Sequence, residues 1–276
     1  MKLFILLLTS IAIRGEEIKV ETDFICIGNV EHEIDVLKTD LDRPYSLVVD
    51  YSTNVLYFSY SLNNIDDVFK TGFINLNTKE FDDLEGVENG FTQTIDQNKH
   101  QVYIGTNDGI YRYEHAKKAA EFYALSGTDI WHIYYKDVIY YSIFPNQFFY
   151  TYINGDVVKF KDLQDTKVDQ FVIDNEDVMF FTNATGLYGQ RKGTDAAKLY
   201  NEYATDGVRA LTTDINGNVF FCRFDGIYTV DKAMASVNKI VDLSDVYSLA
   251  FDNVNNIIYS DESKIVRLKP KKDKAC

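Results

Sequence analysis

The sequence predicts an all-β fold, built from one small sheet repeated around a ring. The first observation is a phrase that occurs three times, as "NDGIYRY" at 107–113, "ATGLYGQ" at 184–190 and "FDGIYTV" at 224–230. The second is composition: the chain has 20 Tyr and 19 Phe but 3 Pro, and aromatic residues favour strands. The third is that no stretch sustains a helical hydrophobic period, which argues against a parallel sheet with helical crossovers.

Six copies of the repeat are found when weaker matches to this motif are sought at the same spacing along the chain. The anchor of each copy is the residue at the slot of the phrase's Gly, and consecutive anchors lie 37 to 40 residues apart. The six anchors are Gly72, Gly109, Phe148, Gly186, Gly226 and Lys264.

Each copy is expected to form four short strands in a fixed order. The first ends in an acidic turn, as in "FTQTIDQNKH" and "ALTTDINGN", because Asp and Asn bond their own main chain. The second is apolar, as in "VLYFSYS" and "VMFFTNA". The third starts at the anchor, where Gly is expected to supply a positive φ and the following Tyr to pack between sheets. The fourth is more polar, as in "VVKFKDL" and "NKIVDL".

The two ends of the chain are predicted to close the ring. The last copy has three strands before the chain ends, and the segment 32–40, "HEIDVLKTD", resembles the missing fourth. Pairing this N-terminal strand with the last copy would hide the edges of an open sheet. Four strands in about 40 residues are typical of a propeller blade. We therefore predict a six-bladed β-propeller that occupies residues 16–276 as a single domain.

Residues 1–15 are predicted to be a secretory signal peptide. Lys2 precedes an apolar run at 3–13 that is too short to span a bilayer, and Arg14 and Gly15 follow it. Removing two basic residues would change the net charge from −14 to 26 minus 42, or −16. Nucleic acids and anionic membranes are bound through basic patches, so neither is expected as a partner. We expect a secreted, extracellular monomer.

Three cysteines and one sequon fit an oxidising compartment. A Cys26–Cys276 disulfide would clamp the two termini and leave Cys222 as a buried free thiol. The odd count leaves a Cys26–Cys222 bond as the alternative. Asn183-Ala-Thr is the one N-glycosylation sequon, and it falls at a predicted hairpin tip.

A ligand site is expected where the innermost strands begin, at one mouth of the central channel. Aligning these strands on their final turn gives a first ring five residues before the turn and a second ring one position later. From these rings we predict eight ligand-binding residues: Tyr45, Phe91, Trp131, His132, Asp169, Gln170, Arg209 and Tyr247. An aromatic cup with an Arg suits a flat aromatic ligand that bears a carboxylate or sulfate. The alternative is that these side chains only pack between blades.

Catalytic signatures are missing from the sequence. It has no Gly-x-Ser-x-Gly elbow, no His-Glu-x-x-His, no phosphate-binding Gly-rich loop and no EF-hand loop. A propeller metal hydrolase would bring several carboxylate or amide ligands to the mouth, where Asp169 alone offers a negative charge. We therefore expect no catalytic residues, no metal, no cofactor and no enzymatic activity.

Phrases along the whole chain resemble the ommochrome-binding proteins of insect haemolymph, best known from moths. They include "RPYSLVVDYSTNVLYFSYS", "FTNATGLYGQRKGT" and "ALTTDINGNVFFC". The resemblance implies a secreted carrier that binds ommochromes, planar acidic phenoxazinone pigments such as the ommatins, without transforming them. It brings no ligand residues with it. Two alternatives stay open: a hydrolase of the lactonase or strictosidine-synthase-like class, and a protein-interaction platform.

Overall fold

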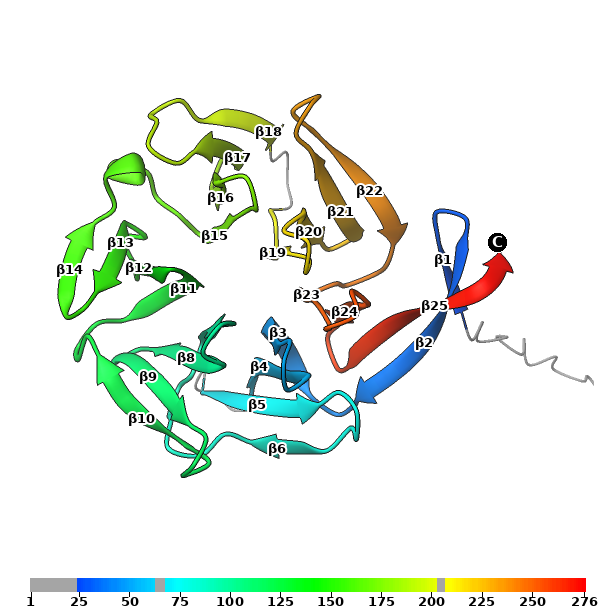
Figure 1. Cartoon of the computed structure of the whole chain (residues 1–276), viewed down its shortest axis with the longest axis horizontal. Helices are drawn as coiled ribbons and strands as arrows, with labels where there is room; N and C mark the ends of the chain where they lie inside the picture. The colour runs from blue at the N-terminus through cyan, green and yellow to red at the C-terminus, as the bar shows by residue number, and fades with distance from the viewer. Residues whose placement is uncertain (1–23, 63–67, 203–206) are drawn as a thin grey trace, which may run out of the picture.

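The chain folds as six antiparallel sheets around a central axis, as the computed structural model shows (Figure 1). The structure describes residues 24–62, 68–202 and 207–276. The predicted six-bladed β-propeller is confirmed. The predicted signal peptide lies outside the described residues.

Each blade runs from an inner strand at the axis to an outer strand at the rim. Blade 1 contains β3 (Asp42–Asp50), β4 (Val55–Ser61), β5 (Phe69–Asn75) and β6 (Phe81–Asp83). Blade 2 contains β7 (Thr92–Asp96), β8 (Gln101–Thr106), β9 (Gly109–Glu114) and β10 (Ala119–Ala124). Blade 3 contains β11 (Ile130–Lys136), β12 (Val138–Ile143), β13 (Phe149–Ile153) and β14 (Asp156–Lys159).

The other three blades continue the same order. Blade 4 contains β15 (Gln170–Ile173), β16 (Val178–Asn183), β17 (Gly186–Arg191) and β18 (Lys198–Glu202), and a short 3-10 turn, η1 (Lys161–Leu163), precedes it. Blade 5 contains β19 (Ala210–Thr213), β20 (Val219–Arg223), β21 (Gly226–Asp231) and β22 (Ser236–Asp242). Blade 6 contains β23 (Ser248–Phe251), β24 (Ile257–Ser260), β25 (Ile265–Ala275), β2 (Val30–Lys38) and β1 (Phe24–Ile27).

Buried Asp side chains build the turn between the first two strands of five blades. In blade 4, for example, Asp174 is 1% exposed and its Oδ1 accepts the N–H groups of Glu176 and Val178 at 2.8 and 2.9 Å. The equivalent residues are Asp50, Asp96, Asp214 and Asp252. Blade 3 has Lys136 instead, whose Nζ donates to the Asp174 carbonyl at 2.6 Å. The acidic turns are therefore structural, as the repeat predicts.

Close approach of the fourth strand explains the Gly of the repeated phrase. A Cβ on Gly109, Gly186 or Gly226 would lie 2.6, 2.4 or 2.2 Å, respectively, from a backbone carbonyl oxygen of the fourth strand of its blade. Gly109 and Gly226 also have the predicted positive φ, at +109° and +150°. Gly186 does not have the predicted positive φ, and close approach to the Asn201 carbonyl is what requires glycine there.

The N-terminal strand closes the ring as predicted, but with an added strand. β2 pairs antiparallel with β25, and its observed bounds, Val30–Lys38, begin and end two residues before the expected 32–40. The sequence did not predict β1, which pairs with β2 and makes blade 6 five-stranded. The Cys26–Cys276 disulfide joins β1 to the end of the chain, with a Cα–Cα distance of 6.1 Å. Cys222 is a buried free thiol, so the alternative Cys26–Cys222 pairing is wrong.

A buried ion cluster fastens β2 to its neighbours. Asp35 is 6% exposed and accepts from Arg267 Nη2 at 2.8 Å and Lys79 Nζ at 2.5 Å, while Lys269 Nζ lies 2.7 Å away. Burial alone would raise the pKa of Asp35, but these three cations hold it well below its usual range. β2 is thus held by ion pairs as well as by its backbone hydrogen bonds to β25.

Candidate functional site

A central cavity of about 620 Å³ follows the inner strands of all six blades. Its lining on β3 begins at Tyr45 and reaches Tyr51, just beyond the end of the strand. The cavity is therefore the channel along the hub, and its wall is supplied by β3, β7, β11, β15, β19 and β23.

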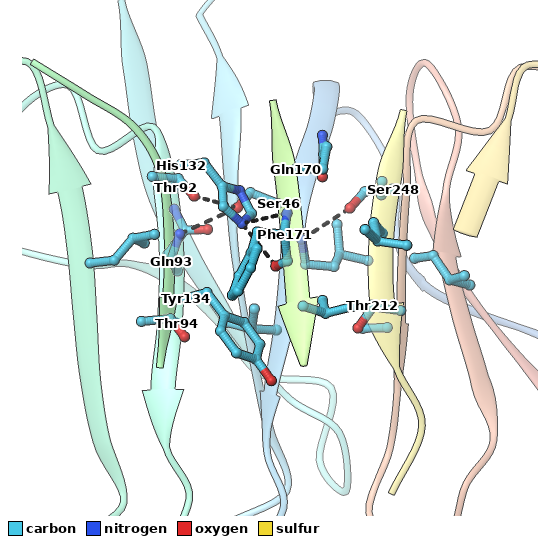
Figure 2. Close-up of a pocket in the computed structure, with 18 of the residues that line it drawn as sticks. Ser46, Thr92, Gln93, Thr94, His132, Tyr134, Gln170, Phe171, Thr212 and Ser248 are labelled. Carbon is cyan, nitrogen blue, oxygen red and sulfur yellow. Dashed lines mark hydrogen bonds between the residues drawn. The ribbon is translucent and has the colours of Figure 1, made fainter. Parts of the chain in front are cut away.

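Two levels of side chains face this channel because alternate residues of a strand point to the same side (Figure 2). The residues between them are buried among the blades. We call the first level the upper tier: Ser46, Thr92, His132, Gln170 and Ser248. The lower tier includes Thr94, Tyr134 and Thr212. Neither tier carries a formal charge when His132 is neutral.

Hub side chains connect each blade to the next. Upper-tier groups account for four of the joints: Gln93 N donates to Ser46 Oγ at 3.3 Å, His132 Nε2 lies 3.1 Å from Phe171 O, Gln170 Nε2 donates to Arg209 O at 3.1 Å, and Leu47 N donates to Ser248 Oγ at 3.0 Å. Tyr135 N donates to Thr94 Oγ1 at 2.8 Å, and Arg209 Nη1 donates to Val246 O at 3.3 Å. Packing between blades was the alternative to a ligand role for the predicted site residues. These inter-blade hydrogen bonds already use some of the donors and acceptors that His132, Gln170 and Arg209 could offer to a ligand.

His132 is neutral in this setting. Burial lowers its pKa to about 4, although the bond to Phe171 opposes that change. Its Nε2 lies within hydrogen-bond distance of both the carbonyl and the N–H of Phe171, so this ring nitrogen is used for the contact between blades 3 and 4. His132 therefore does not supply a positive charge to an anionic ligand near pH 7.

An arc of aromatic rings borders the mouth on blades 1 to 3. Phe91 lies between Tyr45 and Trp131, with ring centroids 5.3 Å from each. Phe69 packs edge-on to Tyr45 at 5.7 Å, and Phe144 stacks on Trp131 at 5.7 Å and 30°. Phe144 is 49% exposed, so the arc ends in an open aromatic face.

Arg209 occupies the opposite part of the mouth. Its guanidinium carbon lies 4.5 Å from the Tyr247 ring centre and 5.3 Å from that of Phe224. Among the described residues it is the one Lys or Arg side chain in the cavity lining, and no described carboxylate lies within ion-pair distance of it. Two aromatic contacts and the bond to Val246 hold this positive charge in place.

The structure brings the predicted residues together. Seven of the eight line the cavity: Tyr45, Phe91, Trp131, His132, Asp169, Gln170 and Arg209. Tyr247 is not part of the lining and instead packs on Arg209. All eight are half-buried, which fits a position at a mouth.

Three mouth aromatics were missed: Phe69, Phe144 and Phe224. Phe144 and Phe224 lie in the turn between second and third strands, and Phe69 begins the third strand of blade 1. Phe144 stands directly before Pro145 and Phe224 directly before Asp225-Gly226. A bulky ring in a tight turn was the available signal, since turns favour small and polar residues.

Asn183 lies at the predicted hairpin tip, at the end of β16 before the turn into β17. Its Oδ1 accepts the N–H and the hydroxyl of Thr185 at 2.8 and 2.7 Å. The neighbouring Thr182 accepts from the backbone of Asp169 and Gln170, which places Asn183 at the same end of the blade as the mouth.

Within the described part of the chain, no three His, Cys, Asp or Glu side chains are grouped to hold a metal ion. No helix among those residues is long and apolar enough to cross a membrane.

The chain is similar over nearly its whole length to the ommochrome-binding protein of Manduca sexta, with 29% identity across 97% of this chain and 98% of that one. The resemblance seen in the sequence is confirmed. No family model matches the chain.

Solved structures share the fold at low identity. A gluconolactonase of Xanthomonas campestris superposes with a TM-score of 0.72 at 9% identity, covering 92% of this chain and 99% of that one. The extracellular domain of a two-component system from B. thetaiotaomicron superposes with a TM-score of 0.59 at 13% identity; the match covers 87% of this chain and 40% of that one. At such identities the likeness shows the propeller fold alone.

Proposed function

We propose that this protein is a secreted, non-enzymatic carrier that binds an ommochrome of the ommatin type in the mouth of its channel. The observation that carries the proposal is the similarity to an ommochrome-binding protein along 97% of the chain. The site supports it, because the mouth combines aromatic rings with one cation that has no described acidic partner.

In this mode the flat ring system of the pigment packs against the aromatic arc. Phe144 and Trp131 supply stacking surface, and Arg209 binds the carboxylate or sulfate. Arg209 is already ordered by Tyr247, Phe224 and Val246, so little side-chain entropy is lost when the anion binds. His132 and Gln170 shape the floor below the pigment and keep the blades in register.

Trp131 makes the proposal measurable, since it is the chain's single tryptophan and lines the cavity. Titration with an ommatin should quench its fluorescence in a saturable way. Arg209→Ala should weaken binding by about 1.5–3 kcal/mol, roughly 10- to 150-fold in Kd, because a charged hydrogen bond is lost.

Arg112→Ala is the matched control for this titration. Arg112 also lies over an aromatic ring, that of Tyr123 at 5.3 Å, but is not in the cavity lining. Arg209→Ala also removes the hydrogen bond from Arg209 to the Val246 carbonyl. Thermal unfolding of both variants shows whether a loss of affinity comes with a loss of stability. Equal affinities for wild type and Arg209→Ala would remove Arg209 from the site, and an unquenched Trp131 with no pigment uptake would refute the carrier.

A lactonase-like hydrolase is the competing function, suggested by the fold shared with the gluconolactonase. It is tested by metal analysis of the purified protein and by lactone hydrolysis with added calcium or zinc. Bound metal with turnover would favour the enzyme. A yellow-red chromophore that co-purifies with the protein would favour the carrier.

Secretion gives a separate prediction. Expression of the full chain in insect cells should release the protein into the medium without its first 15 or so residues and with an N-glycan on Asn183. Mass spectrometry before and after N-glycosidase F measures both changes. Asn183→Gln should remove the glycan mass while Asn29→Gln, outside any sequon, should not. Retention of residues 1–15 in the product would contradict the signal peptide.

A further inference from the structure

Two opposite charges lie on neighbouring inner strands without pairing to each other. Asp169 and Arg209 occupy equivalent places, each one residue before the start of an inner strand, β15 or β19. The N–H of each donates to the second strand of its own blade at 2.9 Å: Asp169 N to Thr182 O, and Arg209 N to Cys222 O. Both side chains line the cavity. The two strands are directly connected, since Gln170 Nε2 donates to Arg209 O at 3.1 Å. Yet neither side chain forms an ion pair with any described residue.

Their other contacts hold the two charges apart. Gln147, in the turn before β13 of blade 3, donates its Nε2 to Asp169 Oδ1. Arg209 is drawn the opposite way, towards blade 6, by Val246 O and the Tyr247 ring. Burial raises the pKa of Asp169, with the charge of Lys167 opposing the change. A half-buried carboxylate and a half-buried guanidinium on the neighbouring strand that do not meet each leave a charge to be neutralised from the cavity.

We propose that Asp169 and Arg209 together form a subsite for a zwitterionic α-amino-acid group on the bound aromatic ligand. Arg209 binds the carboxylate, and Asp169 accepts a hydrogen bond from the ammonium group. The flat part of the ligand extends from this subsite onto Trp131 and Phe144. The inference rests on the proposed function, and it narrows the ligand class from acidic aromatics to those that carry a free amino acid.

The test couples changes in the protein to changes in the ligand. The probes are an ommatin with a free amino-acid side chain and its N-acetyl derivative, each titrated against wild type, Asp169→Asn and Arg209→Gln. Asp169→Asn should weaken binding of the free pigment roughly tenfold or more but leave the N-acetyl derivative unaffected, because that ligand has no ammonium group. Arg209→Gln should weaken both. Wild type should prefer the free pigment by about the same factor that Asp169→Asn removes.

Asn at position 169 is nearly isosteric and still offers Gln147 an acceptor, so the local fold is retained. Asp129→Asn is the control: burial also raises the pKa of this carboxyl, but it is not part of the cavity lining. Equal losses for the two probes in Asp169→Asn, or no loss for either, would overturn the subsite while leaving the carrier intact. Failure of wild type to bind either probe would overturn the proposed function and the subsite with it.

Discussion

At the scale of single residues, His132 shows what the sequence could and could not predict about the site. Its position in the channel follows from the repeat, because equivalent places in six copied strands must surround one axis. The hydrogen-bond partner of its side chain could not be predicted. Whether Nε2 meets a ligand or Phe171 of the next blade depends on how two blades are set against each other, and no pattern within one copy records that.

His132 also makes a pH prediction. Burial lowers its pKa to about 4, against about 6.5 in an unfolded chain. Between these values the unfolded state binds the extra proton, so His132 makes the folded state lose stability as pH falls from 6.5 towards 4. The full shift in pKa would correspond to a larger free energy, but His132 is half-buried at the cavity and its charge is screened by solvent, so we expect a contribution of about 1–2 kcal/mol over this window.

The measurement compares urea unfolding of wild type and His132→Gln at pH 7.5 and pH 4.5. Gln cannot titrate and can still donate to the Phe171 carbonyl. The acid-induced loss of unfolding free energy should be smaller in the variant. Parallel losses in the two proteins would show that His132 is not the titrating group.

At the scale of strands and turns, most of the architecture was predictable because each element has a local cause. The buried Asp of the first turn bonds its own backbone, and glycine is required where the neighbouring carbonyl leaves no room for a Cβ. The elements that were missed lack such a cause or lie outside the repeat. β1 has four residues and exists because β2 offers it an edge, and Phe144 and Phe224 stand in turns that the repeat identifies only as turns.

At the scale of the whole molecule, the ring is held by joints that differ from blade to blade. Five of them are hub hydrogen bonds between consecutive blades, from Ser46 in blade 1 to Val246 in blade 6. The sixth joint is between the last blade and the first, where Leu47 N bonds Ser248 Oγ and Ser260 Oγ donates to Pro44 O at 2.6 Å. Blade 6 itself is assembled from both ends of the chain, so its integrity depends on β2 staying bound to β25.

The disulfide should therefore matter for global stability. Cys26 and Cys276 are 250 residues apart, so the bond closes nearly the whole described chain and restricts the unfolded state strongly. Cys276→Ser should lower the free energy of unfolding by about 2–4 kcal/mol and the Tm by roughly 5–15 °C. The β2–β25 ladder and the Asp35 cluster remain, so the variant should still fold into six blades. Differential scanning calorimetry with and without a reducing agent provides the measurement.

Reductant should lower the Tm of wild type to that of the variant and leave the variant unchanged, because burial raises the pKa of Cys222 to about 12 and keeps that thiol unreactive. A Tm that does not respond to reduction in wild type would mean that the ring is held closed by β2 and its ion cluster alone.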